Sequence, residues 1–214
     1  MRMKLKPYIF LLCLISFVSC EKLIDKDKSS NYYYNWNGSK IIYTDNSTWN
    51  YKGTVDCDFE TFKVINGKWA KDKYHIIYDG KTRPIIDIKT FYFDENNLPK
   101  DSNNVYTTYW SGNFNSMLKW EGADPLTFKL IKIENGVNRE MWGKDDKNYY
   151  RMLNPLKCHY ESFEILSDSY SKDKDNVYYE SQIIREGDPI TFKFDSIQRV
   201  FRDKNFTYYR GERK

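Results

Sequence analysis

The chain has 214 residues, of which 18% are aromatic and 30% are charged, and its formal net charge is +4. This length suits one domain or one repeat array. Arg2, Lys4 and Lys6 lie in the first 19 residues, which contain no negative charge, so the remainder carries only +1. With no basic stripe outside this segment, the composition argues against a nucleic-acid partner.

The N-terminal residues predict a bacterial lipoprotein signal. Basic residues precede an apolar stretch from Tyr8 to Val18, which is shorter than the roughly 20 residues of a membrane-spanning helix. The stretch ends in Phe17-Val18-Ser19-Cys20, which is similar to a lipobox, in which the cysteine is acylated. An ordinary signal peptide is the alternative.

Lipidation of Cys20 would hold the mature protein at a bacterial envelope membrane, the outer membrane if the cell is Gram-negative. The charged residues after Cys20 contain few apolar side chains, so we expect a tether there. The expected organisation is a signal peptide at 1–19, a lipidated tether at 20–31 and a single repeat domain at 32–214.

An Asp-x-x-Thr-Phe step recurs along the chain, with its phenylalanines 29, 37, 35 and 29 residues apart. Those phenylalanines are Phe62, Phe91, Phe128, Phe163 and Phe192. A period of this size indicates stacked units that cannot bury an apolar face alone. The step aspartates, followed by proline in two copies, favour a short helical corner, with the phenylalanines stacked in the core.

Asp-rich turns followed by paired aromatics accompany the steps. The clearest are Asp173-Lys174-Asp175-Asn176-Val177-Tyr178-Tyr179 and Asp146-Lys147-Asn148-Tyr149-Tyr150. Aspartate and asparagine form turns by bonding their own downstream backbone, and the short alternating segments between turns predict strands. We therefore expect an all-β fold of tandem β-hairpin repeats, with a period of about 27–30 residues. The repeats would form an extended antiparallel sheet or a solenoid-like array, with helical corners at the steps.

These phrases resemble the DKNYY family, a group of bacterial repeat proteins named for that string. The resemblance spans roughly residues 40–211 and rests on Asp146–Tyr150, the Asp-Pro-x-Thr-Phe steps at Asp124 and Asp188, and Ala70–Lys73. It implies a repeat fold, and it implies no settled activity, cofactor or catalytic residue.

An insertion at 109–120 breaks the period and adds large aromatics outside any repeat position; a second excess covers 134–142. Insertions in repeat proteins map to loops, often on the binding face. The candidate binding residues are Tyr109, Trp110, Phe114 and Trp120. We expect a protein or an envelope glycan as the partner. Trp49 and Trp69, at repeat positions, are expected in the core.

The sequence contains no recognisable catalytic or metal-binding motif. His75 and His159 lie in different repeats without a cysteine pair, which does not suit zinc. Glu121 and Asp124 could serve a glycan hydrolase, but such adjacency is expected by chance among 30 carboxylates. We therefore expect a non-catalytic binding module without cofactor. The alternative is a glycan-binding protein or glycan hydrolase using residues 109–124.

Besides Cys20, two cysteines remain after signal removal. Cys57 and Cys158 each precede a step at the same repeat position. In an open array we expect two buried free thiols, whereas a closed array would allow a disulfide.

Overall fold

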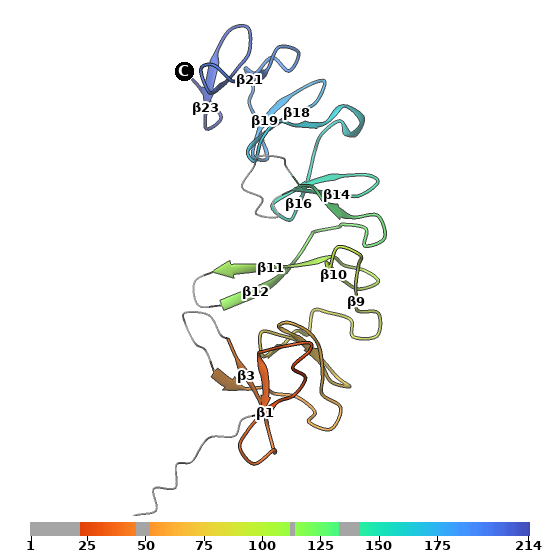
Figure 1. Ribbon diagram of the computed structural model, residues 1–214. Coiled ribbons are helices and arrows are strands. Elements are labelled where there is room, and N and C mark those ends of the chain that lie inside the picture. The colour runs from red at the N-terminus through yellow and green to blue at the C-terminus, as the bar shows by residue number, and fades with distance from the viewer. Residues whose placement is uncertain (1–21, 46–51, 112–113, 133–141) are drawn as a thin grey trace, which may run out of the picture. The chain divides into compact units, whose positions relative to one another are not determined.

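The computed structural model describes residues 22–45, 52–111, 114–132 and 142–214. Within these ranges all regular structure is β, apart from one 3-10 turn, η1 (Tyr160–Ser162). The chain divides after Arg83 into an N-terminal unit and a C-terminal unit that begins at Pro84. Figure 1 shows the strands gathered in small groups within each unit. The prediction of an all-β fold is confirmed.

The N-terminal unit holds two four-stranded antiparallel sheets. The first runs β1 (Lys22–Leu23), β2 (Tyr32–Tyr34), β3 (Ile41–Thr44), β4 (Lys52–Thr54), and the second β5 (Lys63–Asn66), β6 (Trp69–Lys71), β7 (Ile76–Tyr78), β8 (Lys81–Thr82). One apolar cluster draws on both sheets and includes Tyr32, Tyr43, Val64 and Ile77. Trp69 is buried, as predicted, whereas Trp49 lies outside the described residues.

Residues 22–31 belong to this fold, so the prediction of a tether there is wrong. Leu23 pairs with Tyr33 across the first sheet. Ser29 is buried, and its hydroxyl donates to the carbonyl oxygen of Gly67 at 2.5 Å. Polar composition suggested a solvated segment, but these polar groups are satisfied by the neighbouring sheet. The predicted signal peptide and Cys20 lie outside the described residues.

The C-terminal unit contains three four-stranded sheets and two pairs of strands. The pairs are β9 (Tyr92–Phe93) with β10 (Pro99–Lys100), and β11 (Tyr106–Ser111) with β12 (Phe114–Lys119). The four-stranded sheets are β13 (Lys129–Leu130), β14 (Trp142–Lys144), β15 (Tyr149–Arg151), β16 (Asn154–Leu156); β17 (Glu164–Ile165), β18 (Tyr170–Lys172), β19 (Val177–Tyr179), β20 (Gln182–Ile183); and β21 (Lys193–Asp195), β22 (Val200–Arg202), β23 (Thr207–Tyr209), β24 (Glu212–Arg213).

Each full repeat is therefore a four-stranded meander and not the two-stranded hairpin that was expected. Strand pairing stays within each meander in the described residues, so several small sheets replace the expected extended sheet. Within a unit, neighbouring sheets instead touch through side chains. For example, Gly211 lies against the ring of Tyr179, where an added Cβ would approach the Tyr179 Cβ to 2.9 Å. The tandem β-repeat architecture itself is confirmed.

A buried aspartate in the turn connects each step to its turn through hydrogen bonds. Asp173 is 4% exposed. Its Oδ1 accepts the N–H groups of Asp175 and Asn176 at 2.8 and 2.7 Å. Its Oδ2 accepts the N–H of His159 at 2.8 Å and the Tyr178 hydroxyl at 2.7 Å. One carboxylate thus organises its own turn, the preceding step and the following strand.

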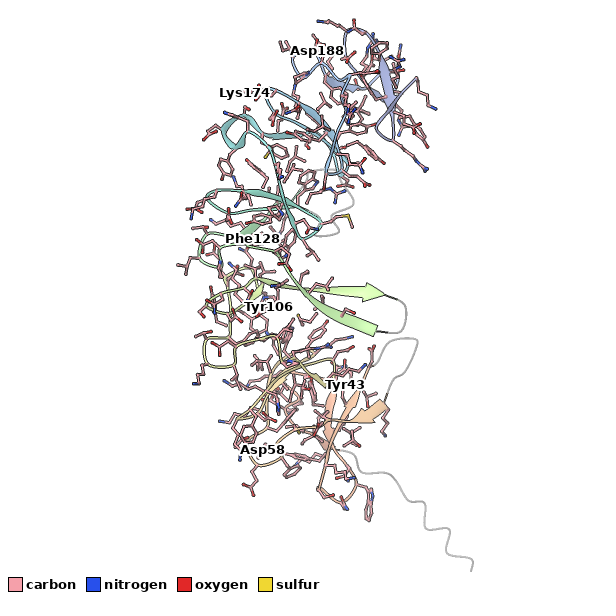
Figure 2. The ribbon with its side chains drawn as sticks, turned by 180° about the vertical axis from the view of Figure 1, so that it is seen from behind. Tyr43, Asp58, Tyr106, Phe128, Lys174 and Asp188 are labelled. Atoms are coloured by element: carbon pink, nitrogen blue, oxygen red, sulfur yellow. The ribbon has the colours of Figure 1, made fainter. Side chains whose placement is uncertain are left out.

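The same arrangement recurs in the other repeats. Asp101, Asp145 and Asp203 bind a step N–H group and the hydroxyl of a tyrosine five residues later; the ring of Tyr106, the partner of Asp101, is labelled in Figure 2. In the repeat of Asp72 that tyrosine is replaced by buried Ile77. There the side chain of His75 contacts the carboxylate.

The step threonine completes this link from the other side. Thr191 Oγ1 accepts the N–H of Lys204 at 3.1 Å, and the Lys204 ammonium lies 3.0 Å from the carboxylate of Asp188. Asp188 Oδ1 in turn accepts the N–H of Ile190. The helical corner forms as a 3-10 turn only at η1; the other steps are single turns. The hydrogen bonds explain why step and turn recur together in the sequence.

Two of the five step phenylalanines pack in the core against tyrosines of their own repeats, whereas Phe62, Phe91 and Phe163 are half-buried. Phe128 and Phe192 are fully buried. Their ring centroids lie 5.6 Å from Tyr150 and 5.3 Å from Tyr208. The predicted core role is confirmed for these two. In place of one step phenylalanine stacking on the next, Phe128 contacts Tyr150, and Phe192 contacts Tyr208 and Phe201.

The network gives an acid-unfolding prediction. Burial raises the pKa of Asp145, Asp173 and Asp203, but the hydrogen bonds they accept outweigh it, so each pKa lies below its ordinary value. Because the folded pKa lies below the unfolded one, the stabilisation is complete above about pH 4 and is lost as pH falls through the folded pKa. We expect the urea midpoint to stay level between about pH 7 and pH 5 and to drop below about pH 4. A midpoint unchanged at about pH 3 would contradict this network.

Cys57 and Cys158 are both partly buried free thiols. Burial raises the pKa of each to about 11. In a variant with Cys13 and Cys20 replaced by serine, we expect thiol reagents at about pH 8 to react roughly a hundredfold more slowly than with free cysteine. After unfolding without reductant, two thiols should titrate. Recovery of a linked peptide containing both cysteines would show a disulfide instead.

Candidate functional site

The insertion at 109–120 forms most of a β-hairpin, so the prediction of a loop is wrong. Strands β11 and β12 pair over six residues each, from Tyr106↔Lys119 to Ser111↔Phe114. The other strands are two to four residues long. In Figure 1 the two arrows lie side by side and reach out from the body of their unit.

Within the described residues, no strand pairs with the outer edge of β12. The N–H of Trp120 donates to the carbonyl oxygen of Val105 at 2.9 Å. Because hydrogen-bonded and non-hydrogen-bonded pairs alternate in an antiparallel ladder, the backbone groups of Met117 and Lys119 point away from β11. Neither residue has a backbone partner on that side among the described residues.

An open groove of about 410 Å³ runs along this part of β12. Its lining residues are Ile85, Asn104, Met117, Leu118, Lys119, Glu121, Leu153 and Asn154. The lining combines apolar side chains with charged groups at the rim, which is the usual composition of a binding site.

One wall of the groove is a strained turn between β15 and β16. Met152 and Leu153 both have positive φ, 46° and 75°. At the equivalent second turn position, two other hairpins carry Gly80 and Gly211, and the β19–β20 hairpin carries Ser181. Leucine in this conformation costs about 1–2 kcal/mol. In return, Leu153 packs against the apolar cluster below, and its carbonyl accepts the N–H of Glu121 at 2.8 Å.

The rim carries one weak ion pair. The ammonium of Lys119 lies 3.5 Å from the carboxylate of Glu121, with side chains 46% and 54% exposed. Pairs this exposed contribute about 0–1 kcal/mol. Both charges are therefore available to an incoming ligand at little cost.

The structure places the predicted binding residues in two groups. Tyr109 and Trp110 lie on β11 and Phe114 on β12, and their side chains lie outside the described residues. Trp120 was expected to be exposed, and this is wrong. It is 1% exposed, and its ring packs 5.0 Å from Phe128 and 6.3 Å from Tyr150.

Residues of the groove wall were missed by sequence reasoning. Met117, Leu118 and Leu153 are unremarkable by type, and only the fold brings them together. A signal for Leu153 was present: Met152-Leu153 stands where other repeats have Asp79-Gly80 and Arg210-Gly211. A large residue at a turn position that favours glycine indicates a local role for that side chain.

The carboxylates considered for glycan hydrolysis have other contacts. Glu121 is exposed beside Lys119. Asp124 Oδ1 accepts the N–H of Leu126 at 2.9 Å, and the Asp124 N–H donates to Asp145. Within the described ranges, no group of three or more His, Cys, Asp or Glu side chains is placed to hold a metal ion. The same ranges contain no helix with the length and hydropathy needed to cross a membrane.

Comparison with known proteins bears on the second half of the chain. The family model described as the DKNYY family matches residues 122–212. No curated protein and no solved structure matches the chain.

Proposed function

We propose that this chain, whose residues 122–212 match the DKNYY family model, is a non-catalytic interaction module displayed on a bacterial envelope membrane. The observation that carries the proposal is the departure of one repeat from the others. In that repeat, a hairpin with two six-residue strands stands in place of the short four-stranded meander, and an open groove lies beside it. A feature that is absent from the sister repeats is not needed to build the fold, and extended repeat surfaces suit macromolecular partners.

The strained turn at Leu153 is a second reason to place the binding site in this region. In the hairpins of Gly80 and Gly211, glycine adopts the positive φ that this turn position requires. Leucine at the same position therefore costs conformational free energy. Strain of this kind clusters at functional sites. The contact of Leu153 with the apolar cluster offsets part of that cost and leaves its outer surface on the groove.

Attachment to the membrane would occur through lipid on Cys20. The first described strand, β1, begins at Lys22, only two residues later, so the lipid would hold the N-terminal unit close to the bilayer surface. We expect cells grown with an alkyne fatty acid to label the wild-type protein and not the Cys20→Ala variant. Unlabelled wild-type protein in the soluble fraction would contradict the anchor.

Trimming the hairpin tests the binding role. Replacing residues 110–115 with Asn-Gly closes β11 and β12 with a two-residue turn after the hydrogen-bonded pair Tyr109↔Ser116. We expect the wild-type protein to capture a partner from solubilised membranes, and the trimmed protein to lose it without a change in melting temperature beyond a few degrees. Trp36→Ala, at a residue 78% exposed in the N-terminal unit, is the control that should retain capture.

Glycan chemistry is the competing outcome. If Tyr109, Trp110 and Phe114 bind sugars, an envelope-glycan array should show binding that the trimmed variant loses. Release of reducing ends from such a glycan, lost in Glu121→Gln or Asp124→Asn, would make the protein an enzyme and overturn the proposal.

A further inference from the structure

We propose that the outer edge of β12 docks an extended segment of a partner polypeptide, which adds to the hairpin as a third strand. This inference rests on the proposed function and names the chemistry of its partner. An unpaired strand edge is a row of N–H donors and C=O acceptors, and another extended chain is the ligand that matches that row.

The length of the edge distinguishes it from the other sheet edges. The four-stranded sheets end in strands of two to four residues, which is one of the ways in which proteins blunt exposed edges. Strand β12 has six residues, and in the part of the chain that the structure describes it pairs only with β11. The outward backbone groups of Met117 and Lys119 therefore offer two hydrogen-bonding positions two residues apart, the spacing at which a neighbouring strand binds.

The groove beside the edge supplies side-chain recognition. Successive side chains of an added strand point to opposite faces, so alternate residues of the partner would face the groove. Leu118, Leu153 and Ile85 line it, and Ile85 is 52% exposed. This lining favours apolar residues at alternate positions of the partner strand.

The rim charges fit the same occupant. Lys119 and Glu121 are paired only weakly with each other. An extended partner with an acidic and a basic residue flanking its apolar positions would satisfy both charges. A lysine on an edge strand also disfavours pairing between two copies of the same edge, so a second copy of this chain fits less well than a different polypeptide.

A proline substitution separates backbone docking from side-chain docking. Lys119→Pro removes the outward N–H but keeps the hairpin bonds of Leu118 and Trp120, and an edge position with its N–H facing outward tolerates proline. Lys119→Ala removes the same ammonium and keeps the N–H. The full-length chain in detergent would select binders from a display library of random short peptides.

We expect peptides with alternating apolar residues to be enriched. Lys119→Ala should bind them within about twofold of wild type, and Lys119→Pro should bind about tenfold more weakly. Methylation of alternate peptide amides should likewise weaken binding. Melting temperatures of both variants within a few degrees of wild type would show that the hairpin is intact.

Other results would overturn the inference. Equal binding by Lys119→Pro and Lys119→Ala would mean docking through side chains alone. A concentration-dependent dimer that Lys119→Pro abolishes would make a second copy the occupant. If no peptide is enriched, but capture or glycan binding still depends on residues 110–115, the strand-addition inference fails while the proposed binding function stands.

Discussion

Replacing Asp173 with alanine is expected to destabilise the protein by about 3 kcal/mol or more. Asp173 is 4% exposed, and its carboxylate accepts hydrogen bonds from three backbone N–H groups and the Tyr178 hydroxyl. Its removal leaves those donors buried without partners, and each orphaned donor costs about 1–3 kcal/mol. Urea unfolding followed by circular dichroism measures the change.

Two matched variants isolate the cause. Asp175 lies two residues away in the same turn but is exposed, so Asp175→Ala should change stability by no more than about 0.5 kcal/mol. Tyr178→Phe removes one donor and keeps the ring, so its cost should be about 1–2 kcal/mol. Equal effects of Asp173→Ala and Asp175→Ala would show that the carboxylate is an ordinary surface group.

Trp120→Ala is expected to cost about 3–5 kcal/mol, because a large buried side chain leaves a cavity. The indole contacts Phe128 and Tyr150 in the apolar cluster of the C-terminal unit. Trp36→Ala is the matched control, since that indole is 78% exposed and should contribute no more than about 0.5 kcal/mol. Thermal unfolding of the two variants beside wild type gives the comparison.

The outcome for Trp120 also bears on the binding site. The burial of Trp120 argues against a direct contact with the ligand. If Trp120→Ala kept a melting temperature close to wild type and lost partner binding, Trp120 would again be a candidate ligand contact. A large loss of stability leaves Tyr109, Trp110 and Phe114 as the aromatic candidates. The strand edge of β12 depends on neither result, since its groups are backbone.

The parts of the fold that depend on local chemistry were predictable from the sequence. A turn aspartate bonds N–H groups two and three residues later, as at Asp173, so the repeated string identifies turns directly. The tandem repeat follows from spacing alone. Counting five residues back from Tyr150 would also have identified Asp145, and not Asp146, as the organising carboxylate, because Asp173–Tyr178 and Asp203–Tyr208 have that separation.

The features that the sequence did not predict depend mainly on contacts between residues that are distant in the chain. Strands of two or three residues, such as β20 and β24, carry too short a pattern to be recognised, so each meander was taken for a hairpin. The burial of Trp120 depends on Phe128 and Tyr150, which only the fold brings to it. Ser29 and its neighbours have polar composition, and their order depends on the sheet beside them.

Predicting the groove requires both the break in the repeat period and the three-dimensional fold. The insertion was visible in the sequence as a break in the period, and the structure forms the β11–β12 hairpin there. Its conversion into a hairpin places Met117 and Lys119 with outward backbone groups, beside a turn 36 residues further along at Leu153. Sequence alone does not bring those two segments together.

Amide hydrogen exchange of the full-length chain, measured with and without a saturating selected peptide, tests the central claim most directly. In the free protein the amides of Met117 and Lys119 should exchange much faster than those of Leu118 and Trp120, which are bonded across the hairpin. With peptide bound, Met117 and Lys119 should become protected to a similar degree as their neighbours. Unchanged exchange at both amides, with protection appearing elsewhere, would contradict strand addition at β12.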